Sequence, residues 1–90
     1  MVEQYNNTVE MGIGSRNWGC KTVNAALTKA AEIFGCEKSE LICEAAEPVY
    51  FGRMVWVYRG EFDADTAASL FVPTKLFLKW RRHKGICQLR

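Results

Sequence analysis

The segment Val49–Arg59 constrains the fold more than any other part of the chain. It is rich in aromatic and β-branched residues, which predicts extended strand structure. Alternate side chains of a strand point to opposite faces, and in this segment both faces are apolar. One face should therefore meet the core, and the other should meet a helix or a partner. Gly52 marks a bulge or a tight hairpin turn, so we expect a β-hairpin or strand pair over about 49–59.

A second pattern predicts a helix over about 22–34. Apolar residues recur there at spacings of three and four, and several alanines favour helix. Thr22 can cap the N-terminus, and Gly35 can end the helix in the left-handed conformation. The apolar positions are Val23, Ala26, Leu27, Ala30, Ile33 and Phe34.

Residues 39–47, between the helix and the strand segment, fit two interpretations. Ser39 can cap a second helix that ends before Pro48, and the content of Glu, Leu and Ala favours this helix. Alternatively, Leu41–Ala45 could form a strand. The sequence leaves both open.

The remaining segments indicate a short strand, a loop and two helices. A strand is expected near Thr8–Ile13, and the three glycines within residues 12–19 indicate a loop. Asp63 can cap a short helix over Ala64–Phe71. A last helix is expected over Lys75–Lys84, with its basic residues concentrated at the C-terminal end, as the helix dipole prefers.

Together these patterns predict an α+β fold in a small single domain, residues 1–90. Its parts would be a central helix at about 22–34, a β-hairpin or strand pair at about 49–59, and one or two C-terminal helices. The chain has 90 residues, of which 49% are hydrophobic and 24% charged, as in an ordinary folded domain.

Charge is distributed unevenly along the chain. Residues 1–65 hold six basic and all ten acidic residues, a balance of −4. Residues 66–90 hold six basic residues and no acidic one, a balance of +6. Such asymmetry indicates a surface for a polyanion or for an acidic protein, and the alternative is a solvated basic helix face.

The basic C-terminal segment leads to the first functional hypothesis, a small non-enzymatic nucleic-acid-binding or regulatory protein. Phe77 and Trp80 lie among the basic residues and could stack on bases, although their spacing of three favours core packing of an amphipathic helix. The expected phosphate contacts are Lys75, Lys79, Arg81, Arg82 and Lys84, with Arg53 near a hairpin turn as an additional contact.

The aromatic strand region leads to the alternative hypothesis, a protein–protein interaction or inhibitor module. A homodimer of this chain is one form of this hypothesis. In a strand, Met54, Trp56 and Tyr58 would face one side. Large aromatic residues anchor many interfaces, so the expected partner contacts are Tyr50, Trp56 and Tyr58.

Nothing in the sequence indicates an enzyme, a metal site or a cofactor. The four cysteines form no CxxC pair, and His83 has no carboxylate near it in sequence. The first residues do not resemble a signal peptide, and no apolar run approaches the ~18–20 residues of a membrane span. We therefore expect a cytoplasmic protein with reduced thiols and no membrane association.

A small residue, Ala31, is followed four positions later by Gly35, and apolar Phe34 and Leu41 flank the turn between them. At these positions residues 28–45 resemble the helix-turn-helix of DNA-binding proteins. The strand pair that follows would sit where the wing sits in winged-helix proteins of the phage-excisionase type. The resemblance implies a small DNA-binding regulator.

The segment that would read the major groove, Ser39–Glu47, departs from that pattern. It carries three glutamates and no Arg, Lys, Asn or Gln, so phosphates would repel it. A second likeness, to the N-terminal domain of the Jag RNA-associated proteins, implies instead a strand over Leu41–Ala45. That likeness is carried by Lys21, Thr22, Val23, Ala26, Leu27, Phe34, Gly35, Glu40, Leu41, Glu47, Pro48, Phe51 and Gly52.

Overall fold

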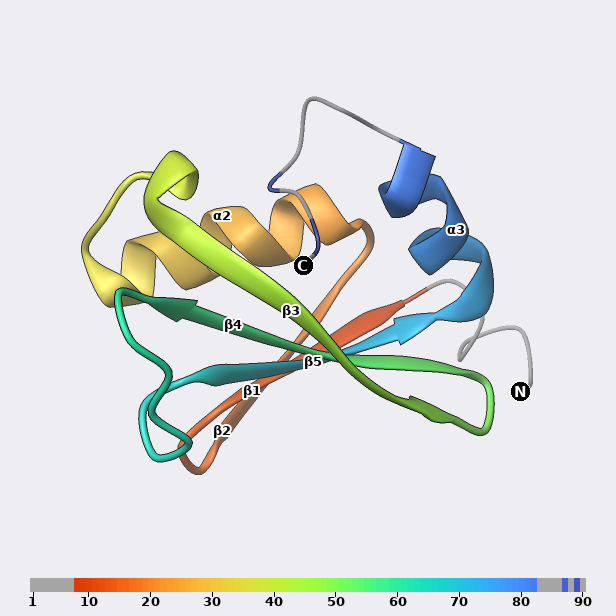
Figure 1. Ribbon diagram of the computed structural model, residues 1–90, viewed down its shortest axis with the longest axis horizontal. Coiled ribbons are helices and arrows are strands. Elements are labelled where there is room, and N and C mark those ends of the chain that lie inside the picture. Colours follow the sequence, from red (N-terminus) through yellow and green to blue (C-terminus); the bar gives the residue numbers. More distant parts are fainter. Residues whose placement is uncertain (1–7, 83–86, 88, 90) are drawn as a thin grey trace.

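A five-stranded antiparallel sheet is the largest element of the structure (Figure 1). The computed structural model describes residues 8–82, 87 and 89. In chain order the strands are β1 (Val9–Ile13), β2 (Arg16–Cys20), β3 (Leu41–Val49), β4 (Gly52–Arg59) and β5 (Ala68–Pro73). Across the sheet the order is β2-β1-β5-β4-β3, so β5 lies in the middle and β2 and β3 lie at the edges.

Both α-helices lie on the same side of the sheet (Figure 1). The helix α2 (Val23–Phe34) follows the β1–β2 hairpin and packs against both of its strands. The helix α3 (Thr74–Arg82) follows β5 and packs against β4 and β5. A short 3-10 helix, η1 (Lys38–Glu40), connects α2 to β3. Among the described residues, no helix is long and apolar enough to cross a membrane.

This architecture corrects the expected one. The prediction of a hairpin or strand pair within residues 49–59 is wrong, because the hairpin joins β3 to β4 through a turn at Tyr50 and Phe51. The sheet has five strands, and it makes up more of the structure than the helices do. The helix expected at 22–34 forms as α2, but it lies on one face of the sheet and not at the centre of the fold.

The strand β3 occupies the segment whose composition favours helix. Leu41 and Cys43 are buried, whereas Ile42 and Glu44 point to the other face, so the burial pattern has a period of two. Pairing with β4 outweighs the helix propensity of Glu and Ala. Residues 28–45 therefore form a helix followed by a strand, without the second helix of a helix-turn-helix.

Two further segments form strands where the sequence predicts other structure. The Asp63 Oδ1 accepts a hydrogen bond from the Asp65 N–H at 3.0 Å, but the helix expected over Ala64–Phe71 does not continue beyond this turn. From Ala68 to Val72, buried and half-buried residues alternate, and they lie in β5. The glycine-rich residues 12–19 belong to the β1–β2 hairpin and are not a loop.

Local signals define both ends of α2. The Thr22 Oγ1 accepts a hydrogen bond from the Ala25 N–H at 3.0 Å, and Gly35 ends the helix with φ at 68°. Ile33, expected on the apolar face, is 41% exposed. The buried positions of α2 are Val23, Ala26, Leu27, Ala30 and Ala31.

The core lies between the helices and one face of the sheet. Leu70 in β5 is fully buried and pairs with Met11 in β1 on one side and with Val55 in β4 on the other. The other buried strand residues of this face are Val9, Leu41, Cys43, Val57, Ala68 and Val72, and α3 adds Phe77 and Trp80. The two helices cover this face and leave the opposite one open.

Gly52 begins β4 where this strand passes close to β5. A Cβ at Gly52 would collide with the Val72 carbonyl oxygen and lie 2.9 Å from the Pro73 Cα, and both are backbone atoms. We predict that Gly52→Ala lowers the free energy of unfolding by roughly 2 kcal/mol or more, because the two strands must separate. Urea unfolding followed by circular dichroism measures the loss.

Gly19→Ala is the matched control for this prediction. Gly19 also lies in a strand, but a Cβ there would meet only side-chain atoms at ordinary contact distances, Thr8 Cγ2 at 3.5 Å and Glu10 Oε2 at 3.7 Å. The control should change the free energy of unfolding by less than about 0.5 kcal/mol. Equal losses in the two variants would contradict the assigned role of Gly52.

Candidate interaction surfaces

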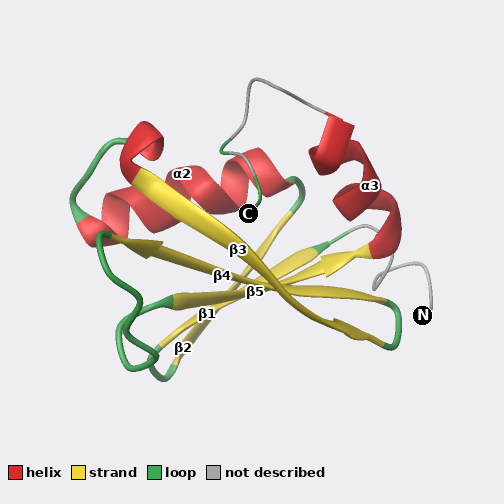
Figure 2. Ribbon diagram, in the orientation of Figure 1, coloured by secondary structure: helices red, strands yellow, loops and turns green. Residues whose placement is uncertain are grey.

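One face of the sheet is covered by neither α-helix (Figure 2). Strand pairing brings apolar side chains from three neighbouring strands together on this face. Met54 lies opposite Phe71, and Tyr58 lies opposite Ile42. We call this surface the open sheet face and define it by Ile42, Met54, Trp56, Tyr58, Phe62 and Phe71.

Three aromatic rings form the centre of the open sheet face. Phe62, from the connection between β4 and β5, lies edge-on to both Trp56 and Tyr58, with ring centroids 5.4 Å apart in each pair. Tyr58 is buried beneath it, and its hydroxyl donates a hydrogen bond to Glu44 Oε1 at 2.6 Å. Phe62 itself is 48% exposed, so an aromatic cluster held in place by its own contacts reaches the surface.

The charges on this face are negative. Among the strand residues that share it, Glu10 and Glu44 are the charged ones, and neither Lys nor Arg occurs there. A nucleic acid would meet carboxylates and no compensating cation at this position. The open sheet face is therefore better suited to a protein than to a polyanion.

The structure brings together two of the three residues predicted to bind a partner. Trp56 and Tyr58 share the open sheet face, as the strand alternation predicts, whereas Tyr50 lies in the β3–β4 turn beyond the other end of β4. Tyr50 is 89% exposed and contacts the Phe51 ring edge-on at 4.5 Å. Sequence reasoning missed Phe62, which lies in a loop and follows no periodic pattern.

The second candidate surface lies on α3. Four predicted phosphate contacts are exposed there, and within the described part of the chain none of their side chains makes a hydrogen bond or an ion pair. We call this the basic helix surface and define it by Lys75, Lys79, Arg81 and Arg82. Lys84, the fifth predicted contact, lies outside the described residues.

The aromatic residues of α3 do not belong to the basic helix surface. Phe77 is 7% exposed and Trp80 is 3% exposed, so neither ring is available to stack on a base. The Trp80 Nε1–H donates a hydrogen bond to the Cys87 carbonyl oxygen at 2.7 Å. The burial confirms the core packing that their spacing favours, and only the positive charges of α3 remain for a contact with nucleic acid.

Arg53 has structural partners. Its Nε donates a hydrogen bond to the Ala46 carbonyl oxygen at 3.0 Å, at the register shift between Ala45 and Pro48 in β3. Its guanidinium carbon lies 5.4 Å from the centroid of the Phe77 ring in α3. The side chain therefore joins β3, β4 and α3, and it is half-buried.

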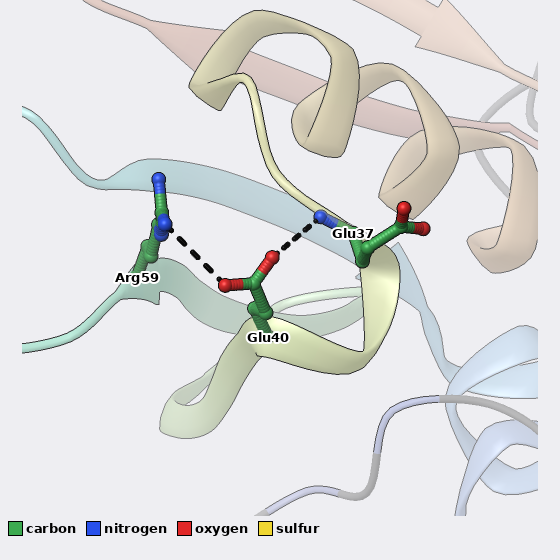
Figure 3. A network of polar contacts seen from close by, with 3 residues as sticks. All are labelled: Glu37, Glu40 and Arg59. Atoms are coloured by element: carbon green, nitrogen blue, oxygen red, sulfur yellow. Dashed lines mark hydrogen bonds and ion pairs between the residues drawn. The ribbon is translucent and has the colours of Figure 1, made fainter.

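A third group of charged residues stabilises the start of β3 (Figure 3). The Glu40 carboxylate accepts hydrogen bonds from the Glu37 backbone N–H at 2.9 Å and from Arg59 Nη2 at 3.3 Å. Because the Arg59 and Glu40 side chains are about half exposed, their ion pair adds little stability. The described residues also contain no group of three or more His, Cys, Asp or Glu side chains placed to hold a metal ion.

Comparison with known protein families, with curated proteins and with solved structures gives no match to this chain.

The contacts of Arg53 predict a structural cost when it is replaced. Arg53→Ala removes a hydrogen bond to a strand carbonyl and a cation–π contact, and it should lower the free energy of unfolding by roughly 1–2 kcal/mol. Arg59→Ala, the exposed control in the same strand, should cost less than about 1 kcal/mol. Thermal and urea unfolding of both variants measure the difference. A smaller loss for Arg53→Ala than for Arg59→Ala would contradict this role.

Proposed function

We propose that this chain is a non-enzymatic protein-interaction module that binds a partner protein through the open sheet face. The observation that carries the proposal is the aromatic cluster of Trp56, Tyr58 and Phe62 on a sheet face that neither α-helix covers. Aromatic residues dominate the binding energy of many interfaces, since they bury a large area at a small cost in side-chain entropy.

The chemistry of the face indicates the kind of partner. Its centre is apolar, and Glu10 and Glu44 supply negative charge beside that centre. A complementary surface would present apolar side chains flanked by Lys or Arg. A face-to-face dimer of this chain fits less well, because it would bring the carboxylates of two copies together without a strand cation on either face.

Photo-crosslinking from single positions tests this proposal. We would place p-benzoylphenylalanine at Phe62 in the full chain, in the cells that make it, and compare it with the same probe at Ile33. Both positions carry apolar side chains that are a little under half exposed, but Ile33 lies on α2. We expect a discrete adduct with another protein from position 62 and none from position 33.

Two further substitutions make this test specific. Trp56→Ala should abolish the adduct from position 62, since it removes the side chain that Phe62 packs against, whereas Tyr50→Ala should leave it unchanged. Phe71→Ser on β5 provides a second change on the same face, and circular dichroism would verify that each variant is folded. The same adducts from both probe positions, no adduct, or an adduct with a second copy of this chain would each contradict the proposal.

A second candidate function rests on a separate observation, the basic helix surface. Four exposed cations on one helix have no acceptor within the described residues, and they could neutralise phosphates or contact an acidic protein. Because Phe77 and Trp80 are buried, this contact would depend on charge and not on base stacking. We infer binding to nucleic acid that varies little with base sequence.

Fluorescence anisotropy with labelled duplex DNA, single-stranded DNA and single-stranded RNA tests this second function. Lys79→Ala/Arg82→Ala should reduce the salt dependence for duplex DNA by about two units of log–log slope, since each phosphate contact contributes roughly 0.9. Arg16→Ala/Lys21→Ala removes two exposed cations elsewhere and should change the slope little. No binding at ~50 mM salt, or equal effects of the two double variants, would overturn it.

A further inference from the structure

Two cysteines that are distant in the sequence meet at the edge of the sheet. The Sγ atoms of Cys43 in β3 and Cys87 near the C-terminus are 2.7 Å apart. The Cys87 Sγ also lies 3.1 Å from the Leu41 carbonyl oxygen, and Leu89 forms a parallel bridge with Cys43. Both the thiols and the backbone therefore place Cys87 and Leu89 alongside β3.

We propose that Cys43 and Cys87 are a redox pair that closes to an intramolecular disulfide when the protein meets a small disulfide oxidant such as glutathione disulfide. The bond would fasten the C-terminal segment to the β3 edge. A disulfide requires the two sulfur atoms to approach to about 2.05 Å, so the side chains need to move by less than an ångström. The proposal is independent of the partner and of the polyanion considered above.

Burial sets the order of the two chemical steps. Cys87 is half-buried, whereas Cys43 has no exposed surface, so the oxidant reaches Cys87 first. The hydrogen bond to Cys87 and then burial raise the pKa of the Cys43 thiol, which keeps Cys43 protonated until its partner has reacted. Cys87 is therefore the attacking thiol and Cys43 the resolving one.

The steps balance in atoms and electrons. The Cys87 thiolate attacks one sulfur of glutathione disulfide, which forms a mixed disulfide and releases one glutathione thiolate. Cys43 then loses its proton to solvent, and its sulfur attacks the Cys87 sulfur and expels the second glutathione. Two protein thiols are oxidised, one glutathione disulfide is reduced to two glutathione molecules, and the two protons lost by the protein are taken up by the released thiolates.

The other two cysteines serve as an internal comparison. Cys20 lies in β2 and Cys36 follows α2, and no thiol contact joins either of them to another cysteine within the described residues. Burial also raises the pKa of Cys20, with Lys29 opposing this effect. Neither residue has the geometry of the Cys43 and Cys87 pair.

The test is oxidation of the folded full chain in about 1 mM each of reduced and oxidised glutathione, followed by acid quenching and alkylation. We expect most molecules to lose two hydrogens in intact mass. A tryptic digest without reduction should then link the peptide 39–53 to the peptide 85–90. Closing a loop of this length should raise the melting temperature by on the order of 10 °C.

Variants assign the bond. Cys20→Ser/Cys36→Ser should keep the linked peptides and the rise in melting temperature. In Cys43→Ala the reaction should stop at the mixed disulfide, with one glutathione bound to Cys87. In Cys87→Ser the Cys43 thiol should remain unmodified. Circular dichroism would verify that each variant is folded. Absence of the linked peptides from the wild-type protein, a Cys20–Cys36 link in their place, or a disulfide that forms only in urea would overturn the proposal.

Discussion

Pairing of β5 with both β1 and β4 joins two hairpins that are far apart in the sequence into one sheet. β5 is the strand that lies between the β1–β2 hairpin and the β3–β4 hairpin in the sheet. Leu70, at the centre of β5, is fully buried between Met11 and Val55, and it faces the layer that the helices cover. Without this middle strand, neither hairpin could contribute to a common core, because an isolated hairpin has too little apolar surface to bury.

The same arrangement separates the two candidate surfaces. Both α-helices pack on one side of the sheet, so the basic residues of α3 lie on that side, while the aromatic cluster and its carboxylates lie on the other (Figure 2). A partner on the open sheet face would not compete with a polyanion on α3 for space. The strand charges of the open sheet face are negative, whereas the exposed cations of α3 lie on the helix side of the sheet.

The parts predicted correctly are those with strong local signals. Thr22 and Gly35 limit α2 by hydrogen bonding and by a left-handed backbone, and both effects act within a few residues. Strand alternation likewise placed Met54, Trp56 and Tyr58 on one face. The segment left open between helix and strand forms most of β3, and the helix expected over 64–71 gives way to β5 from Ala68 onward. Both strands form by pairing with β4, and β5 also pairs with β1. Such pairing involves residues that no local window includes.

By itself, the sequence determined the limits of α2, the extended structure of Gly52–Arg59 and the cluster of positive charge in the last 25 residues, since each depends on neighbouring residues. Only the tertiary structure decided which apolar residues remain exposed. It buried Phe77 and Trp80 of α3 in the core, left Trp56 and Phe62 on a face without a helix, and brought Cys43 within reach of Cys87. These outcomes follow from the order of strands in the sheet, because that order sets which distant segments share a face and which face the two helices can cover.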